Sequence, residues 1–508
     1  MIKLIKKNMN AIAEAYAGSL FVRSLLENQS DIIKANKLKK KEIHIITDRL
    51  MDIEIVKNQI LLKFLSEGSL SINQLKKEFN FSDFQIVKYI SILQNEGWLE
   101  LRDISNKIYG IKPIITKNKD KLEIDLISPW NLRSVYDPIK IIVDANLCCL
   151  CGICKAVCPV DAITIPDNKP IIDENKCIHC GLCNYHCPRT SMPLNILKMY
   201  ISNSQFNLFQ DLKEQPIGPY KLIKSAQTSN DKIKEVCQDG GMVTTFLQYL
   251  FEKNEIDGAI VVKRKPNSWD TMPVIITNFD DILKASGTKY AISPNFIALD
   301  KSNEVECKKL AFVGTPCQVQ AMRKYQVYSN IFEEIWGKIE YIIGIFCMES
   351  FPYENVIKIS EELCETPINK VSKMDIDKGK FFVYDLDKNS KQIPIKEVTS
   401  LARHPCHYCL DLTNELSDIT CGSIGSGPGW NTIIIRSEKG NNLYNNALKD
   451  NYFQIKDIIE DKPFGLPLIK KLSNIKRKGN FNNLIRILDD IPLSYYNSLK
   501  KIMRIEEK

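Results

Sequence analysis

The feature that most constrains this chain is a cysteine pattern that occurs twice. The spacing C-x2-C-x2-C-x3-C-P spans 148–159 and recurs at 177–188. This spacing lets three thiolates ligate one [4Fe–4S] cubane, while the fourth cysteine of each run ligates the other cluster. The proline ends each run because it cannot continue a helix. The pattern therefore predicts two [4Fe–4S] clusters and a role in electron transfer.

Crossed ligation assigns each cysteine of this bacterial-type ferredoxin repeat to one cluster. The first cluster is expected on Cys148, Cys151, Cys154 and Cys187, and the second on Cys177, Cys180, Cys183 and Cys158. Zinc also binds C-x2-C pairs, but the doubled spacing and the closing prolines favour iron–sulfur clusters. Cys149 fits no ligand position and is expected to be a packed side chain or a spare thiol. His179 and His186 are expected at the surface or beside the ligands, because the cysteines already complete both sites.

The chain as a whole has the composition of an ordinary globular protein. Its 508 residues are enough for about three domains, and 44% of them are hydrophobic and 26% charged. Seventeen cysteines, clustered and with no apolar signal-peptide core after the basic start, indicate metal or redox sites rather than disulfides. No apolar stretch approaches the roughly 20 residues that span a bilayer. We therefore expect a cytoplasmic protein without a transmembrane segment, and peripheral association with a membrane complex stays open.

Four parts follow one another along the chain, which is expected to have a multidomain α+β fold. Residues 1–142 have a mostly helical pattern, 143–200 hold the ferredoxin repeat, 218–445 alternate strand-like and helical runs, and 446–508 are helical and basic. The third part is expected to be an α/β domain with strands at 258–263, 309–314 and 339–346. The net charge of +8 is concentrated at the end of the chain. This indicates a solvated face, or a surface that docks an acidic partner, an anionic coenzyme or a membrane.

Within the first part, residues 55–112 resemble a winged helix-turn-helix module. Helices are expected at 58–67, 71–79 and 82–95, followed by a strand at 97–101. Ser71 and Ser82 suit the N-cap positions of the second and third helices. DNA-reading helices usually present Arg or Lys side chains, whereas the third helix has only Lys88 and an opposing Asp83. We predict a protein-docking or structural role without nucleic-acid binding, and a redox-sensing DNA-binding regulator is the alternative.

A second set of cysteines lies within the α/β part. Cys317 follows the second predicted strand, Cys347 follows the third, and Cys406 and Cys409 form a C-x2-C pair. α/β proteins place ligands at the carboxyl ends of strands. Four thiolates converging from these positions would make a third closed site. The alternative is that these cysteines are buried and packed.

Six short motifs surround these cysteines. They occur at 237–245, 286–290, 313–318, 406–411, 417–422 and 429–436. Together and in this order they resemble the family of coenzyme F420 hydrogenase/dehydrogenase beta subunits, over about 218–440. With the ferredoxin repeat in front, the chain resembles the F420H2-oxidising input subunit of F420H2 dehydrogenases. The part before the repeat lies outside the resemblance.

The resemblance implies that 218–445 binds FAD, coenzyme F420 and one [4Fe–4S] cluster, so that three [4Fe–4S] clusters are expected in all. The implied ligands of the third cluster are Cys317, Cys347, Cys406 and Cys409. Cys421 is not assigned as a ligand. The other cysteines of this part are expected to be structural: Cys237, Cys307 and Cys364.

The implied FAD and F420 contacts lie in three of the motifs. They are Gly240, Gly241, Thr244, Thr245, Ser286, Gly287, Thr288, Lys289, Tyr290, Gly314, Thr315 and Gln318. A Gly-Gly pair before a helix suits a pyrophosphate, because backbone N–H groups at a helix N-terminus favour an anion. Without the family, the pair indicates only a turn. Lys289 is expected to contact phosphate or the flavin, and turn chemistry is the alternative for 286–288.

The resemblance also implies an order of carriers. F420H2 gives up a hydride, iron–sulfur clusters accept single electrons, and a flavin connects the two. The expected order is F420H2, FAD, the Cys317-centred cluster, the two ferredoxin clusters, and then a ferredoxin or a subunit of an oxidoreductase complex. No acid–base catalytic residue is expected, since hydride transfer between flavin-like rings needs none. A ferredoxin-fed flavin reductase of an organic substrate is the alternative enzyme.

Overall fold

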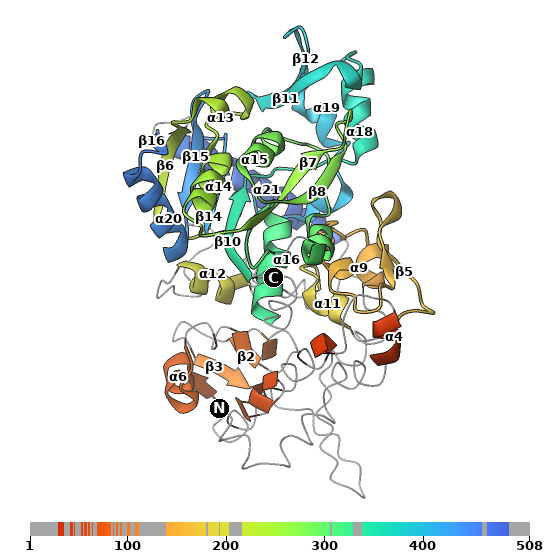
Figure 1. The fold of residues 1–508 in the computed structure, drawn as a ribbon, viewed down its shortest axis with the longest axis vertical. Helices are drawn as coiled ribbons and strands as arrows, with labels where there is room; N and C mark the ends of the chain where they lie inside the picture. The colour runs from red at the N-terminus through yellow and green to blue at the C-terminus, as the bar shows by residue number, and fades with distance from the viewer. Residues whose placement is uncertain are drawn as a thin grey trace, which may run out of the picture.

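A mixed eight-stranded sheet lies at the centre of the computed structural model (Figure 1). The structure describes 139–178, 181–190, 192, 194–202, 216–304, 307–328, 338–459 and 465–486, with short stretches between 29 and 110. In spatial order the strands are β16 (Phe453–Lys456), β6 (Leu222–Thr228), β15 (Asn431–Ile435), β14 (Ile419–Gly422), β10 (Lys338–Ile345), β9 (Lys309–Gly314), β7 (Gly258–Arg264) and β8 (Thr271–Ile276). The three predicted strands are confirmed as β7, β9 and β10.

Five strands of this sheet run in the same direction. β9 pairs in parallel with both β7 and β10, and β10 pairs in parallel with β14. β6 points the same way as β14, because both strands pair antiparallel with β15. The carboxyl ends of β6, β7, β9, β10 and β14 therefore share one edge of the sheet. Open α/β sheets bind their ligands at this edge.

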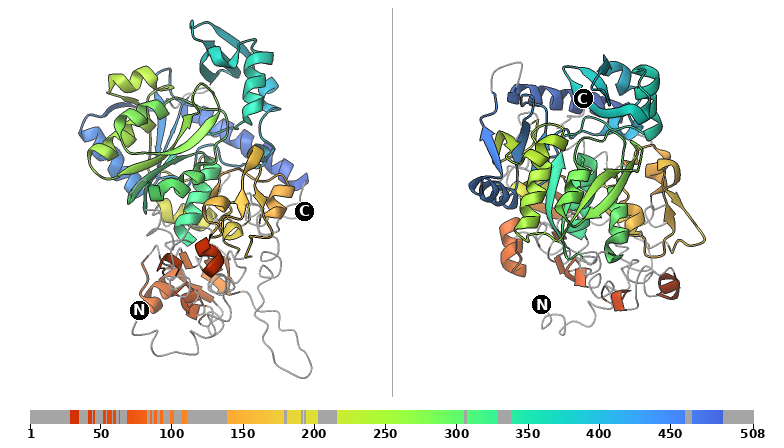
Figure 2. Two further views of the ribbon diagram at one scale, coloured as in Figure 1. Left: turned by 45° about the vertical axis from the view of Figure 1, so that its right-hand side comes forward. Right: turned by 45° about the horizontal axis from the view of Figure 1, so that its top comes forward.

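Successive residues of the strands face two different cores. Ala259 and Ala311 pack in one buried cluster, while their neighbours Ile260 and Phe312 pack in another, because side chains alternate between the faces of a strand. The first face is covered by α14 (Met242–Glu252), α15 (Phe279–Ala285) and α20 (Glu438–Lys449). The second is covered by α16 (Pro316–Tyr328), η2 (Asn295–Glu304) and the cysteine-rich segment (Figures 1 and 2).

The cysteine-rich segment, 139–202, contains two similar arms and a two-stranded sheet. Its elements are α9 (Lys140–Asp144), α10 (Ile153–Ala156), β4 (Ile163–Thr164), η1 (Pro166–Asn168), β5 (Ile171–Ile172), α11 (Leu182–His186) and α12 (Leu194–Ser202). Gly152 and Gly181 occupy the same position in the two arms, with φ angles of +88° and +73°. Glycine adopts this left-handed conformation without strain. A side chain at Gly152 would also meet the carbonyl oxygen of Pro294, at 2.9 Å, so this glycine permits close packing on the α/β domain.

A smaller antiparallel sheet has its own core and projects from the main sheet (Figure 2). Phe351 and Phe381 are fully buried in that core. Its elements are α18 (Tyr353–Lys358), the π-helical turn η3 (Ile359–Leu363), η4 (Ile368–Lys370), β11 (Val371–Asp377), β12 (Lys380–Asp385), β13 (Ser390–Pro394) and α19 (Ile395–Thr399). The remaining elements of this half are α13 (Asp231–Val236), η5 (His404–Tyr408) and α21 (Gly465–Arg486).

The main sheet extends past the domain boundary that was expected at residue 445. That position lies inside α20, and β16 beyond it pairs antiparallel with β6. The C-terminal part contains helix α21. This helix packs on the rest of the domain and is not a separate basic extension. Its Phe481 and Leu484 are buried in one cluster with Tyr408 of η5. One face of α21 therefore belongs to the core.

The described parts of 29–110 include a small antiparallel sheet. The elements are α4 (Gln29–Lys34), β1 (Ser69–Ser71), α6 (Ile72–Phe79), β2 (Leu99–Leu101) and β3 (Lys107–Gly110). Ser71 ends β1, and α6 begins at the next residue. Ser82 is confirmed as an N-cap, because its N–H donates to Gln85 Oε1 (2.9 Å) and its Oγ accepts from the Gln85 N–H (3.3 Å). Much of the predicted helices at 58–67 and 82–95 lies outside the described residues, and the winged-helix assignment stays a prediction.

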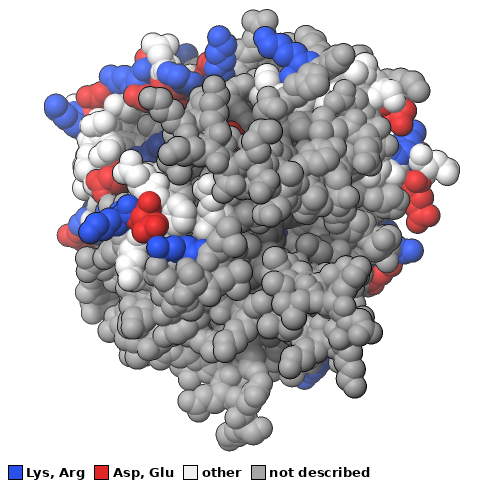
Figure 3. Space-filling model, turned by 90° about the horizontal axis from the view of Figure 1, so that it is seen from below, with Lys and Arg blue, Asp and Glu red and all other residues white. Residues whose placement is uncertain are grey.

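Among the described residues at the rim of the face seen from below, side chains of both charge signs are present (Figure 3). Within the described residues, no helix combines the length and the hydropathy needed to cross a bilayer.

Candidate iron–sulfur and cofactor-binding sites

The thiols expected at the first cluster form one group of buried and partly buried side chains, here called the Cys148 site: Cys148, Cys151, Cys154 and Cys187. Burial raises the pKa of Cys154 well above its ordinary value, and the nearby thiols of Cys148 and Cys187 raise it further. Backbone N–H groups two residues along the chain point at the sulfurs of Cys148 and Cys151. The structure thus brings the fourth cysteine of the second run to the first run, as crossed ligation requires.

The second cluster is expected on four thiols that are here called the Cys177 site: Cys158, Cys177, Cys180 and Cys183. Cys158, Cys177 and Cys183 face a space of about 340 Å³, part of which is open to solvent. The rest of the lining is apolar: Val160, Ala162, Ile163, Ile172, Ile178, Gly181 and Leu182. The Ala162 N–H donates to Cys158 Sγ at 3.3 Å. Cys180 and His179 lie outside the described residues. An apolar pocket lined by thiols fits a ferredoxin-type cluster.

Cys317 lies in the first turn of α16, directly after β9. Gln318 fixes this turn, since its Oε1 accepts from the Thr315 N–H (2.8 Å) and its Nε2 donates to the Ser293 carbonyl (2.7 Å). The Thr315 hydroxyl lies 3.4 Å from the Cys317 sulfur. The turn next to Cys317 therefore contains three of the expected FAD or F420 contacts: Gly314, Thr315 and Gln318.

The four thiols of the third expected cluster are neighbours and are here called the Cys317 site: Cys317, Cys347, Cys406 and Cys409. Cys347 follows β10, and its N–H donates to the Leu412 carbonyl (3.0 Å). Burial raises the pKa of Cys347 well above its ordinary value, the Lys476 ammonium lowers it, and the other three thiols raise it. These thiols come from three separate segments that the fold brings to one place. The donor set fits a [4Fe–4S] cluster, in which each cysteine ligates its own iron.

A single metal ion needs its protein ligands closer together than an iron–sulfur cluster does. Among the residues that the structure describes, no three His, Cys, Asp or Glu side chains are close enough to hold one metal ion. A zinc ion holds its sulfur ligands about 2.3 Å from a single centre. The cysteines of a cubane lie farther apart, because each binds a different iron. The finding therefore concerns single ions and not clusters.

Helix α21 supplies polar contacts to the Cys317 site that the sequence analysis missed. Lys476 is 4% exposed, and its Nζ donates to the carbonyls of Cys347 (2.6 Å) and Asp411 (2.9 Å). Burial lowers the pKa of Lys476, but the nearby thiols and the Asp411 carboxylate outweigh it and raise the pKa above its ordinary value. Asn480 Nδ2 donates to the carbonyls of Cys406 (2.9 Å) and Cys409 (2.7 Å). The sequence offered little signal for these contacts, because lysines and apolar residues alternate along α21 without a clear apolar stripe.

The Cys317 and Cys148 sites are in contact through Cys149. This buried thiol lies within hydrogen-bonding reach of Cys151 on one side and Cys317 on the other. Arg403 Nη2 donates to the Cys148 carbonyl (3.2 Å), and the Phe296 N–H donates to the Cys151 carbonyl (3.0 Å). Cys149 was expected to be a packed side chain or a spare thiol. It is packed, and its place is the junction between two thiol sites.

Two buried basic side chains lie beside Cys187. Lys324 of α16 donates to the Cys187 carbonyl (2.7 Å) and to Thr190 Oγ1 (3.1 Å), and burial lowers the pKa of Lys324 to about 7. His186 is fully buried, with Nδ1 2.8 Å from the Leu182 carbonyl, and burial lowers its pKa to about 4. Of the two positions expected for His186, the structure shows the one beside the ligands and not the surface.

The Gly-Gly pair lies at the N-terminus of α14. Gly241 is the N-cap and has a φ angle of +70°. A side chain on Gly240 would clash with the backbone of Asn431 and Ala226. The Met242 N–H donates to Asn431 Oδ1 (3.1 Å), so one N–H group of this helix end already has a protein partner. Close packing of β6, β15 and α14 is therefore sufficient to explain both glycines.

The remaining expected contacts near α14 bond mainly to protein groups. Thr244 Oγ1 lies 2.9 Å from Ser286 Oγ, which joins α14 to the loop after α15. Thr245 Oγ1 donates to Thr228 Oγ1 (2.7 Å) inside the core. The structure therefore brings Thr244 and Ser286 together and leaves Thr245 inside.

The loop 286–290 forms a turn whose lysine caps α15. Gly287 has a φ angle of +79°, and Thr288 follows it in the turn. Lys289 Nζ donates to the carbonyls of Ser286 (2.9 Å) and Gly287 (3.0 Å), and burial lowers the pKa of Lys289 to about 7. The Tyr290 ring packs against Phe381, with centroids 5.1 Å apart. Lys289 therefore has helix-capping partners before any ligand is considered.

Asn414 is a further polar residue at the carboxyl edge of the sheet. Its Nδ2 donates to the carbonyls of Gly314 (2.8 Å) and Ile345 (3.3 Å), which end β9 and β10. Its Oδ1 is buried and has no hydrogen-bond partner among the described residues. A buried acceptor without a partner costs free energy, so this atom is a candidate ligand contact. Its sequence signal is weak, because Asn414 lies in a polar run outside the strands.

Three family models match the chain. The N-terminal and C-terminal models of the coenzyme F420 hydrogenase/dehydrogenase beta subunit match 223–300 and 307–461. A 4Fe-4S dicluster domain model matches 140–188. The matched ranges cover the cysteine-rich segment and the main sheet, in that order.

Characterised relatives match the same region. The beta subunit of coenzyme F420 hydrogenase from Methanosarcina barkeri is 37% identical over 270 residues, which are 53% of this chain and 92% of the relative. A subunit of F420H2 dehydrogenase from Methanosarcina mazei is 34% identical over 350 residues, 67% of this chain and 92% of the relative. The coenzyme F420-dependent sulfite reductase of Methanocaldococcus jannaschii is 33% identical over 350 residues, 67% of this chain and 52% of the relative.

A solved structure agrees with these matches. One chain of the xenon-derivatized F420-reducing [NiFe] hydrogenase complex from Methanosarcina barkeri aligns with a TM-score of 0.52 and 36% identity, covering 54% of this chain and 95% of that one. The chain therefore belongs to the family of coenzyme F420 hydrogenase/dehydrogenase beta subunits and carries a 4Fe–4S dicluster domain in front of the family's fold.

Proposed function

We propose that this chain is an oxidoreductase that transfers electrons between coenzyme F420 and a one-electron carrier, through FAD and three [4Fe–4S] clusters. The observation that carries the proposal is the continuity of the thiol sites. Cys149 contacts the Cys317 and Cys148 sites, and Cys154 of the Cys148 site lies close to Cys183 of the Cys177 site. The names of the three relatives described above include F420 and support this coenzyme as the hydride donor or acceptor.

Each thiol site has a proposed place in the order of carriers. The Cys317 site, at the carboxyl ends of β9 and β10, holds the cluster nearest to the flavin. The Cys148 site holds the next cluster, and the Cys177 site, whose cavity opens partly to solvent, holds the one that faces the protein partner. FAD, when bound, would supply the link between a hydride and single electrons. The chain's own task is to hold these groups in line and to keep them away from water.

The proposed FAD and F420 contacts lie around the carboxyl edge of the sheet. Thr244 and Ser286, which are joined there, offer hydroxyl groups, and Gly241 begins a helix whose first N–H groups are partly bound by Asn431. Asn414 Oδ1 adds a buried acceptor between β9 and β10. Lys289 caps α15, so its proposed contact with phosphate or flavin would compete with the carbonyls that it now binds.

The partner proposed for the last step is a ferredoxin or a subunit of an oxidoreductase complex. Relatives that are subunits of F420 enzymes support a protein partner. A cytoplasmic location with peripheral association with a membrane complex is part of the same proposal. The comparisons give no support to a reductase of an organic substrate or to a DNA-binding regulator.

Cofactor content after anaerobic reconstitution tests the proposal. We expect about 12 irons and one FAD for each full-length chain, from three four-iron sites. About eight irons would remove the Cys317 site from the account. Tightly bound zinc in place of iron would contradict the assignment of the ferredoxin repeat.

A further inference from the structure

Helix α21 lies over the loop that carries two thiols of the Cys317 site. Asn480 Nδ2 donates to the carbonyls of Cys406 and Cys409, at 2.9 and 2.7 Å. Asn483 Nδ2 donates to the carbonyl of His407 between them, at 3.1 Å. Side chains of the helix therefore bind the C-x2-C turn at three of its backbone carbonyls. The helix begins after the range that the family model matches.

Lys476 places a buried ammonium group in the same region. Its Nζ donates to the carbonyl of Cys347 on one side and to the carbonyl of Asp411 on the other. Both acceptors are neutral oxygens. The thiols of Cys347, Cys406 and Cys409 are close enough to interact electrostatically with this ammonium. A positive charge is thus held in the interior, beside the place where a cluster would bind.

The acidic groups nearby do not cancel this charge by pairing with it. The Asp411 carboxylate accepts the N–H groups of Asn414 and Glu415 at 2.8 and 2.9 Å. The Glu415 carboxylate is ion-paired with Lys198 and Arg477. Lys476 forms none of the ion pairs found among the described residues; its two contacts are the carbonyls named above. Its charge therefore remains to act on the thiol site.

We infer that Lys476 sets the reduction potential of the cluster at the Cys317 site, by holding a positive charge beside it. The inference rests on the proposed function, because it requires a cluster on these four cysteines. A reduced cluster carries one more negative charge than an oxidised one, so a nearby cation stabilises the reduced form. Net charge, hydrogen bonds to sulfur and solvent exposure are the quantities that set such potentials, and burial strengthens the interaction because the local dielectric is low.

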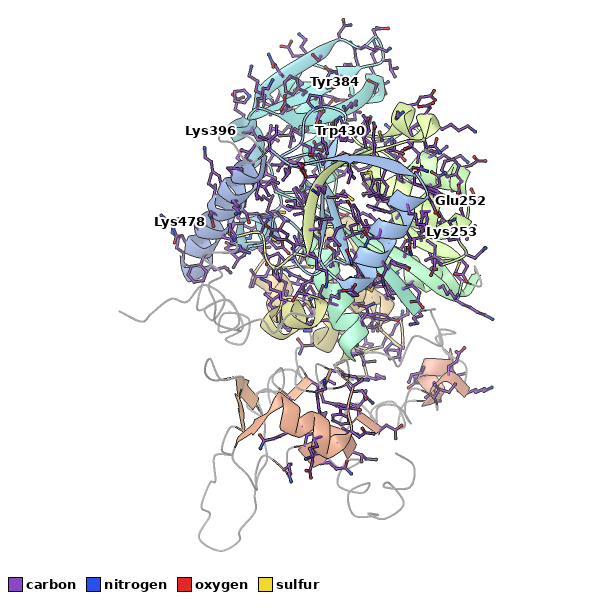
Figure 4. All side chains as sticks on the ribbon, turned by 90° about the vertical axis from the view of Figure 1, so that its left-hand side faces the viewer. Glu252, Lys253, Tyr384, Lys396, Trp430 and Lys478 are labelled. Atoms are coloured by element: carbon purple, nitrogen blue, oxygen red, sulfur yellow. The ribbon has the colours of Figure 1, made fainter. Side chains whose placement is uncertain are left out.

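Lys478 provides a matched control on the same helix. Lys478→Gln removes the same charge two residues away, but this side chain is exposed on the outer side of α21 (Figure 4). Water screens an exposed charge, so its loss should leave the potential unchanged. Lys476→Gln removes the buried charge and keeps a hydrogen-bond donor. Lys476→Arg keeps the charge.

The test is an EPR-monitored redox titration of the full-length, anaerobically reconstituted protein. The component belonging to the Cys317 site is identified as the one that is absent from a Cys347→Ser variant. In Lys476→Gln we expect this component to become at least tenfold harder to reduce, which is a fall of about 59 mV for one electron. The two components of the ferredoxin repeat should not move. Lys478→Gln and Lys476→Arg should leave the potential close to that of the unmodified protein.

Three results would overturn the inference, and a fourth concerns the proposed function instead. An unchanged potential in Lys476→Gln with full iron content would show that the charge does not act on the cluster. An equal shift in Lys478→Gln would show that the effect is not local. Loss of four irons in both Lys476→Gln and Lys476→Met, with Lys476→Arg intact, would assign Lys476 to holding the loop. About eight irons in the unmodified protein would instead remove the third cluster and with it the proposed function.

Discussion

The cysteine-rich segment and the Cys317 site hold their thiols in two different ways. In the segment, all expected ligands come from 148–187, and neighbouring backbone N–H groups point at the sulfurs. At the Cys317 site the thiols come from three distant segments, and side chains of α21 bind the carbonyls of the loop between them. The first kind of site is local and the second depends on tertiary packing. We therefore expect the second to fail first when the fold is disturbed.

Removing α21 should give the largest difference in iron retention between the Cys317 site and the ferredoxin repeat. A chain ending at residue 461 lacks Lys476 and Asn480, which bind the loops of the Cys317 site, and also Phe481, which packs with Ile142 and Leu147 of the cysteine-rich segment. The ferredoxin repeat keeps the N–H groups of its own loops around the sulfurs, whereas the Cys317 site loses its side-chain contacts. We expect the iron content to fall from about 12 to about eight per chain. Iron analysis after anaerobic reconstitution measures this.

The control for this truncation is a chain that ends at Arg486, the last residue of α21. It should keep all of its iron. Equal iron contents in the two truncated proteins would contradict the view that α21 supports the Cys317 site.

Loss of a ferredoxin ligand should affect the ferredoxin repeat and leave the Cys317 site intact. Cys183→Ala removes a thiol from the Cys177 site, at the far end of the proposed path. We expect loss of about four irons and of electron transfer to a protein acceptor, while F420H2 still reduces the bound flavin at an unchanged rate. Stopped-flow absorbance of the flavin measures this. As a control, Cys307→Ala changes a buried cysteine outside all three sites and should lose no iron. Failure of flavin reduction in a folded Cys183→Ala protein would refute the proposed order of carriers.

The ion pairs that join the two regions should contribute several kcal/mol to the free energy of unfolding. Glu415, beside the Cys317 site, is ion-paired with Lys198 of the cysteine-rich segment and with Arg477 of α21, and all three side chains are buried. Glu415→Gln leaves two buried cations without their carboxylate. We expect a loss of about 3–5 kcal/mol in the free energy of unfolding at pH 7. Urea unfolding followed by tryptophan fluorescence measures it.

The same carboxylate predicts a pH dependence. Burial alone would raise the pKa of Glu415, but Arg477 and Lys198 lower it from 4.5 to about 2. Because the pKa in the folded state is the lower one, the stabilisation is complete above pH 4.5 and is lost as the pH falls towards 2. The difference between the unmodified and Glu415→Gln proteins should shrink over that range. A difference that stays constant would contradict the ion-pair explanation.

A single hydrogen-bonding side chain should give the smallest effect. Asn480→Ala leaves the partly buried carbonyls of Cys406 and Cys409 without their amide donor. Its expected cost is about 1–3 kcal/mol in the free energy of unfolding, together with faster loss of the Cys317-site cluster in air. Asn474→Ala, at an exposed position of the same helix, should change neither. Equal effects of the two substitutions would show that α21 does not act through these contacts.

The parts of this account that the sequence predicted are those with local signals. The ferredoxin repeat has all of its expected ligands within one short stretch, so their spacing alone predicted the two groups of thiols. β7, β9 and β10 are apolar runs that end at turn or cysteine positions, and the prediction of these strands was correct. Ser82 was a correct N-cap prediction, and its partner Gln85 lies only three residues along the chain.

Features that depend on distant partners were missed. β16 joins the sheet through β6, more than 200 residues earlier in the chain, and nothing local to either strand specifies that pair. Lys476 looked like part of a solvated basic tail, because the carbonyls that it binds belong to the segments after β10 and η5. For His186, the expected position beside the ligands was correct, but its complete burial, which depends on α16 packing against α11, was not predicted. Only the assembled fold gives these residues their partners.

The most direct test of the central claim is to mix the anaerobically reconstituted full-length protein with F420H2 and a one-electron dye, and to follow the absorbance of the deazaflavin. The account predicts that oxidised F420 appears while the dye is reduced, with two dye molecules for each F420H2, and that both changes require bound FAD. Unchanged F420H2 in the presence of protein with full iron and flavin content would contradict it.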